Sequence, residues 1–124
     1  MRRLLALPAA LVLAALAGSA FAADVSGTWL RDTGASKVRF SKCGAALCGH
    51  IAWLKPDAET KAKVGQRIFF DMKPSGDNAW SGSAFNPDDG KTYTGKMTLS
   101  GDTLTTAGCV MGVICKSTTW TRSN

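Results

Sequence analysis

The side chains that could support catalysis are few and poorly spaced for it. His50 is the only histidine in the chain. A general base needs a nucleophile and an orienting acid within reach, and no local spacing supplies them around His50. Ser81-Gly82-Ser83 lacks the strand-to-helix context of a hydrolase nucleophile. We therefore predict no catalytic residue, and we predict that the protein is not an enzyme.

The acidic pair Asp88-Asp89, followed by Gly90, could be mistaken for part of a calcium loop. Such a loop needs six or more oxygen ligands from spaced acidic residues, including a late bidentate carboxylate. Lys91 follows at once, which does not fit that pattern. A hairpin turn is the better interpretation. We predict neither a metal nor any other cofactor.

The N-terminus has the layout of a secretory signal peptide. Arg2 and Arg3 precede an apolar run from Leu4 to Ala17, and the small-residue triplet Ala20-Phe21-Ala22 follows. The run is too short for a stable membrane anchor, and no second long apolar stretch follows it. We predict cleavage after Ala22, which leaves 124 − 22 = 102 residues, 23–124, as a single domain without an integral membrane segment.

The four cysteines, at positions 43, 48, 109 and 115, all follow the predicted leader. An even number of cysteines in a small exported chain indicates disulfides, and four allow three connectivities. We predict Cys43–Cys48 and Cys109–Cys115, because each pair brackets a glycine-containing segment that can turn. Zinc is the alternative, but spacings of four and five intervening residues fit zinc ligation poorly.

Alternation of apolar and polar residues with a period of two dominates the rest of the chain. Between Lys91 and Leu99, for example, Tyr93, Gly95, Met97 and Leu99 share one face. Turn residues separate eight such stretches, which we predict as strands at 26–31, 37–42, 47–54, 67–72, 79–85, 91–99, 103–110 and 113–121. Residues 57–64 form either a short helix or an irregular loop. The predicted fold is all-β.

Eight short antiparallel strands leave no exposed sheet edge if they close into an up-and-down barrel. Such a barrel is filled by side chains or holds one small ligand. The four tryptophans, Trp29, Trp53, Trp80 and Trp120, fall on four different predicted strands and are either core filler or part of a pocket lining. The predicted lining is Phe40, Trp53, Trp80, Tyr93 and Met97, with Arg67 or Lys116 as a polar anchor.

Two sets of motifs resemble known families. Gly27-Thr28-Trp29 at the start and Trp120-Thr121-Arg122 at the end are similar to lipocalins, which implies that Trp29 plugs one barrel end and Arg122 packs across it. Further strings resemble the bacterial secreted family called domain of unknown function 2147. These strings are Cys43-Gly44, Leu47-Cys48-Gly49, Ile51-Ala52-Trp53-Leu54-Lys55, Asn86-Pro87, Asp89-Gly90-Lys91-Thr92-Tyr93 and Gly108-Cys109. The resemblance implies a lipocalin-like barrel and supplies no catalytic residue.

Two functions compete. The first is a periplasmic or secreted module that binds a small apolar or amphipathic molecule. The second is a protein–protein module or enzyme inhibitor, which meets an envelope protein through the apolar hairpin tip at residues 109–115. Nucleic acid is excluded as a partner because the basic residues are dispersed. Without the leader there are 13 basic and 9 acidic residues, a net charge of +4, and no two basic residues are adjacent.

Overall fold

The computed structural model describes residues 24–123, so the predicted leader at 1–22 lies outside the described residues. The described chain is all-β and contains no helix. Its eight strands are β1 (Gly27–Arg31), β2 (Ser36–Cys43), β3 (Ala46–Leu54), β4 (Arg67–Gly76), β5 (Ala79–Asn86), β6 (Lys91–Ser100), β7 (Thr103–Val110) and β8 (Ile114–Ser123). Residues 57–64 form an irregular loop, and Asp57 adopts a φ of 69°, which no helix contains.

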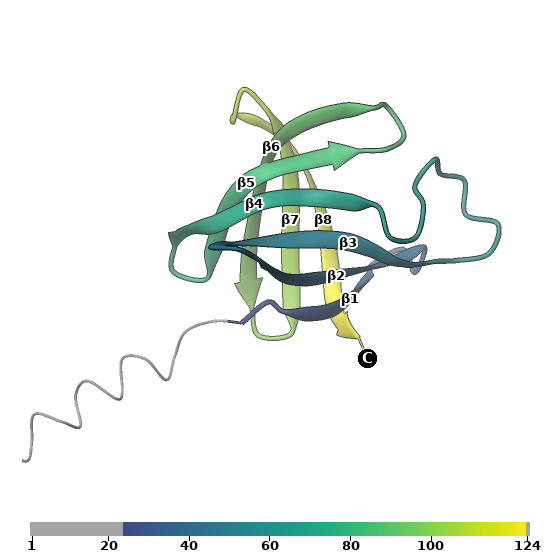
Figure 1. Ribbon diagram of the computed structural model, residues 1–124, viewed down its shortest axis with the longest axis horizontal. Helices are drawn as coiled ribbons and strands as arrows, with labels where there is room; N and C mark the ends of the chain where they lie inside the picture. The colour runs from purple at the N-terminus through teal and green to yellow at the C-terminus, as the bar shows by residue number, and fades with distance from the viewer. Residues whose placement is uncertain (1–23, 124) are drawn as a thin grey trace, which may run out of the picture.

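The strands form a closed antiparallel barrel in sequence order (Figure 1). Each strand pairs with the next, and β1 also pairs with β8 through Thr28 opposite Ser123 and Arg31 opposite Trp120. Closure leaves no free edge strand, which removes the usual site of edge-to-edge aggregation. The predicted eight-stranded up-and-down barrel is confirmed.

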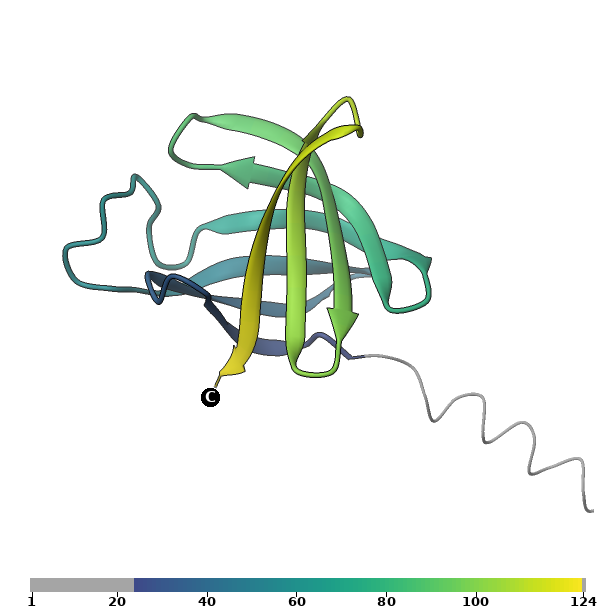
Figure 2. The same cartoon turned by 180° about the vertical axis from the view of Figure 1, so that it is seen from behind.

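The two ends of the barrel differ. The turns that join β2 to β3, β4 to β5 and β6 to β7 lie at one end, together with residues 24–26 and the end of β8; we call this the closed end. The turns that join β1 to β2, β5 to β6 and β7 to β8 lie at the other end, which we call the mouth. The long connection at residues 55–66 also belongs to the mouth and projects from the barrel in both ribbon views (Figures 1 and 2).

Strand β4 contains a bulge that changes which residues face inward. Its register with β5 shifts between Phe70 and Lys73, and Asp71 adopts a φ of 50°. A second irregularity, in the register of β4 with β3, lies between the pairs Arg67–His50 and Phe69–Gly49, and there the neighbouring residues Ile68 and Phe69 are both buried, which strict alternation would not allow. A Cβ placed on Gly82 of β5 would lie 2.5 Å from the carbonyl oxygens of Phe70 and Asp71. Glycine at position 82 is therefore what lets the bulge approach β5.

The hydrophobic core fills the closed half of the barrel. Trp29, Val38, Met72 and Leu104 are each 0 % exposed, and Phe40 packs against Phe69 with ring centroids 5.2 Å apart. Burial of side chains of this size contributes about 1.5–3 kcal/mol each to the free energy of unfolding. The stability of the domain therefore resides mainly in this half.

Both predicted disulfides are present. Cys43–Cys48 links β2 to β3 next to their turn at the closed end. Cys109–Cys115 links β7 to β8 next to their turn at the mouth. Each bridge therefore fixes one hairpin, which agrees with the oxidising compartment that the cysteine pattern predicts.

Within residues 24–123, no helix is long and apolar enough to cross a membrane.

Candidate functional site

A cavity of about 620 Å³ occupies the mouth half of the barrel interior and opens at the mouth. Its deep surface is formed by Trp120, Phe69 and Ile68, which are all at least nine-tenths buried. Its rim is formed by the connection at 55–66, the β5–β6 turn and the mouth ends of β7 and β8. A concave site of this volume is in the range that binds small molecules.

The space exists because inward-facing residues become smaller toward the mouth. Along β5 the large Trp80 lies in the core, whereas Ala84 lines the cavity. Along β7 the buried Leu104 is followed by Gly108 at the cavity wall. In β2 the order is reversed along the chain, and Ser36 lines the cavity while Phe40 fills the core. The sequence therefore fills one half of the barrel and leaves the other half hollow.

The floor of the cavity is held in place by a buried hydrogen bond. The indole Nε1–H of Trp120 on β8 donates to Oγ1 of Thr106 on β7 at 2.9 Å. Thr106 is 4 % exposed, so this bond satisfies two polar groups that water does not reach. The ring of Trp120 is thereby fixed as a flat apolar surface beneath the open space.

Arg31 brings a positive charge to the cavity wall. It is the last residue of β1 and pairs with Trp120 of β8, so it lies beside the cavity floor. Its Nε is buried and finds no hydrogen-bond partner among the described residues. The sequence analysis missed Arg31, although it follows the inward-facing Trp29 by two positions and alternation therefore directs it inward as well.

The carboxylates of Asp88 and Asp89 organise the rim. Oδ1 of Asp88 accepts hydrogen bonds from the Thr60 hydroxyl at 2.9 Å and from the Lys61 backbone N–H at 2.7 Å, which ties the connection at 55–66 to the β5–β6 turn. Asp89 accepts hydrogen bonds from the Tyr93 hydroxyl at Oδ2 and from the Lys91 backbone N–H at Oδ1. The Tyr93 hydrogen bond is the main reason why the pKa of Asp89 lies below its ordinary value, and the same bond raises the pKa of Tyr93.

Of the seven predicted ligand-binding residues, the structure brings two to the cavity. Tyr93 on β6 and Lys116 on β8 both line it. Phe40, Trp80 and Met97 lie in the packed core of the closed half. That these three are buried follows from their alternation, but their depth follows from the stagger of the closed barrel, which no local pattern encodes.

The remaining two, Trp53 and Arg67, lie on the outside. The register of β2 with β3 shifts so that Val38 pairs with Ile51 but Lys37 pairs with Trp53, and this irregularity turns the indole outward. Trp53 is 38 % exposed, with the Lys37 ammonium 5.6 Å from its ring centroid. Arg67 is exposed, and its Nε lies 3.4 Å from Nε2 of His50 on the outer surface.

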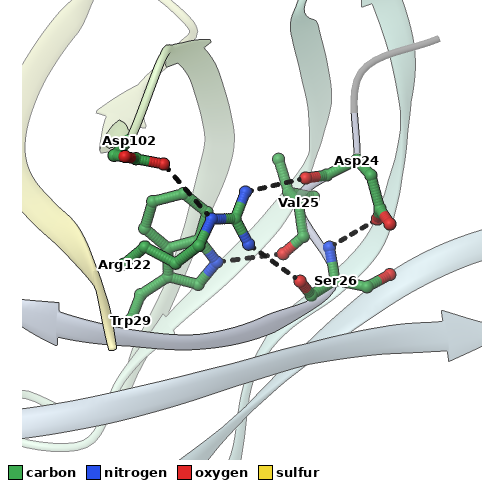
Figure 3. A network of polar contacts seen from close by, with 6 residues as sticks. All are labelled: Asp24, Val25, Ser26, Trp29, Asp102 and Arg122. Atoms are coloured by element: carbon green, nitrogen blue, oxygen red, sulfur yellow. Dashed lines mark hydrogen bonds and ion pairs between the residues drawn. The ribbon is translucent and has the colours of Figure 1, made fainter. Parts of the chain in front are cut away.

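Trp29 and Arg122 seal the closed end (Figure 3). The Arg122 guanidinium lies 4.2 Å from the centroid of the fully buried Trp29 ring. It donates from Nη1 to the Ser26 carbonyl at 3.1 Å and from Nη2 to the Asp24 carbonyl at 3.0 Å. The indole Nε1–H of Trp29 donates to the Val25 carbonyl at 2.9 Å. These contacts bind the segment before β1 across this end of the barrel.

The β7–β8 hairpin tip presents apolar side chains to solvent. Met111 is 90 % exposed, and Val113 and Ile114 are 77 % and 75 % exposed. The Lys96 ammonium donates to the Gly112 carbonyl at 3.0 Å, and the Cys109–Cys115 disulfide closes the base of the tip. The tip is therefore a fixed apolar projection beside the mouth.

No cluster of three or more metal-ligating side chains occurs in the part of the chain that the structure describes.

A barrel of eight strands that is sealed by a tryptophan and an arginine at one end and is hollow at the other defines a lipocalin-like protein. Protein HP1028 from the human pathogen Helicobacter pylori, described as belonging to the lipocalin family, has a similar solved structure. The TM-score is 0.67 at 17% sequence identity, over 82% of this chain and 84% of that chain. The comparison establishes the lipocalin-like fold.

The family itself follows from the sequence match. The family model described as "Uncharacterized protein conserved in bacteria (DUF2147)" matches residues 27–122, and the chain belongs to this family. The predicted resemblance is thereby confirmed. No curated protein matches the chain.

Proposed function

We propose that the protein is an exported, periplasmic binding module that holds one small apolar or amphipathic molecule in the cavity of its barrel. The observation that carries this proposal is the hollow of about 620 Å³ with an apolar floor and an open mouth. Two disulfides and membership of a family conserved in bacteria support an extracytoplasmic location. A binding role needs no catalytic group, and we assign none.

The dimensions and lining of the cavity suggest the kind of ligand. Its volume equals that of about twenty water molecules at their share of about 30 Å³ each, which suits a molecule with a similar number of non-hydrogen atoms. Leu54, Ile68 and Phe69 would contact its apolar part, and Tyr93 and Lys116 would contact it near the mouth. Roles for Phe40, Trp53, Arg67, Trp80 and Met97 in binding stay predictions.

The test is to fill the cavity. The change Ala84→Trp places an indole in the space, whereas Thr98→Trp places the same ring on an exposed strand position and serves as the matched control. Dodecanol, a neutral single-chain amphiphile, should appear as a one-to-one adduct in native mass spectrometry of the wild type and of Thr98→Trp, but not of Ala84→Trp. Thermal melts establish that all three are folded. No adduct on the wild type, or an equal adduct on Ala84→Trp, would refute the proposal.

The exposed hairpin tip favours a second candidate function, the docking of an envelope protein. The partner would present an apolar pocket rimmed by acidic groups, because Lys96 and Lys116 flank the tip. Met111→Asp should abolish association with a purified partner identified by cross-linking, whereas Val64→Asp, at another exposed apolar residue, should not. Equal association of both variants would exclude the tip as the interface.

A further inference from the structure

We propose that Arg31 is the binding site for an anionic head group, so that the ligands of the barrel are acidic single-chain amphiphiles with a carboxylate or phosphate. This inference rests on the proposed binding function and names the chemical class of its ligand. It assigns to the cavity a polar anchor other than Arg67 and Lys116, which the sequence analysis predicted for that role.

Arg31 differs from other arginines of the barrel in how its guanidinium is satisfied. Arg122 donates to two backbone carbonyls and lies 3.7 Å from an oxygen of Asp102. Arg39, on the outer surface, donates to the Thr28 hydroxyl at 3.3 Å. The Arg31 Nε is buried without a partner, and no acidic side chain within residues 24–123 forms an ion pair with Arg31.

Arg31 as a whole is half-buried, but a buried guanidinium N–H without an acceptor is energetically unfavourable, since it gives up hydration and gains no hydrogen bond in return. Arginine cannot relieve this cost by losing its proton. A ligand that brings a negative charge to Arg31 would remove the penalty and would satisfy Nε at the same time. The planar guanidinium matches the two oxygens of a carboxylate or phosphate in a bidentate arrangement.

The charges around the cavity favour this head group at the wall rather than at the rim. Glu59, Asp88 and Asp89 line the mouth and would repel an anion there, and only Lys116 opposes them. Beside the floor, Arg31 is the charged residue that lines the cavity. An acidic amphiphile would therefore place its head against Arg31 and extend its chain along the apolar wall toward the mouth.

The experiment compares three ligands that share a twelve-carbon chain: dodecanoate, dodecyl phosphate and dodecanol. Affinities are measured by calorimetry for the full exported protein, for Arg31→Met and for Arg39→Met, which removes the same charge from the outer surface. Loss of a charge-assisted hydrogen bond corresponds to about a 10- to 100-fold change in affinity. Arg31→Met should lower the affinity for at least one of the two anions by this factor and leave the affinity for dodecanol unchanged. Arg39→Met should leave the affinities for all three ligands unchanged.

A second measurement needs no substitution and so does not depend on the folding of Arg31→Met. In a ¹⁵N spectrum of the wild-type arginine side chains, the Arg31 Nε–H signal should shift on addition of the anion that binds more tightly. The corresponding signals of Arg39 and Arg122 should stay in place.

The outcomes separate this inference from the proposed function. Binding of all three ligands with equal affinity, or anion binding that leaves the Arg31 signal unmoved, would overturn the anchor and leave the binding module intact. A failure of all three ligands to bind would overturn both. Preference for dodecanoate over dodecyl phosphate, or the reverse, identifies the head group, and either preference supports the anchor if it depends on Arg31.

Discussion

Replacing Arg122 by methionine tests whether the closed end is sealed by the guanidinium or only by packing. Methionine retains an apolar stem over the Trp29 ring but loses the charge and both hydrogen bonds to the carbonyls of Asp24 and Ser26. Hydrogen bonds from charged donors contribute about 1.5–3 kcal/mol each when buried. The cation–π contact contributes about 0.5–2 kcal/mol.

The Arg122 side chain is 37% exposed, so these values must be reduced for solvent screening. We expect Arg122→Met to lower the free energy of unfolding by about 2–3 kcal/mol, which for a domain of this size corresponds to roughly 10–20 °C in melting temperature. Urea unfolding followed by tryptophan fluorescence measures the change directly.

Two further variants separate the contributions. Asp102→Asn should change the free energy of unfolding by less than about 1 kcal/mol, because the Asp102 side chain is 88% exposed and the ion pair spans 3.7 Å. Arg122→Lys keeps the charge but cannot reach both carbonyls. Its free energy of unfolding should therefore lie between those of Arg122→Met and the wild type. A change below about 0.5 kcal/mol for Arg122→Met would refute the view that the guanidinium holds the closed end together.

Three other perturbations have expected outcomes. Gly82→Ala should destabilise the fold by at least about 1–3 kcal/mol in urea unfolding, because its Cβ would meet two backbone oxygens of the β4 bulge at 2.5 Å. Tyr93→Phe should raise the pKa of Asp89 toward its ordinary value in an NMR titration. The stability that this hydrogen bond gives the wild type is present above the pKa of Asp89 in the unfolded chain. It is lost as the pH falls through the lower pKa of Asp89 in the folded protein. Replacing both Cys109 and Cys115 by alanine should lower the free energy of unfolding by about 2 kcal/mol without opening the barrel.

Local patterns in the sequence were sufficient to predict the barrel. The alternation through Tyr93, Gly95 and Met97 is a property of one strand, and turn residues mark where each strand ends. The disulfides followed in the same way, since Cys43–Cys48 and Cys109–Cys115 each close a single hairpin. Features that depend on one strand or one turn can be inferred without knowing how the strands are placed relative to one another.

The cavity could not be predicted in this way because it depends on register between strands. A register shift of β4 against β3 at Ile68 brings both Ile68 and Phe69 inward, and an irregularity of β3 against β2 next to Lys37 turns Trp53 outward. One extra residue reverses the facing of every residue beyond it. The inward position of Arg31, by contrast, depends on β1 alone, since alternation places it on the same face as Trp29.

The unequal filling of the barrel has a consequence for how the chain can change over time. The large side chains of the closed half supply most of the buried apolar surface that stabilises the fold. The residues around the mouth contribute little to this stability. Substitutions near the opening can therefore accumulate at small cost to folding, whereas those beneath the floor cannot. Members of the family should therefore resemble one another in the residues of the closed half and differ more in the residues around the mouth.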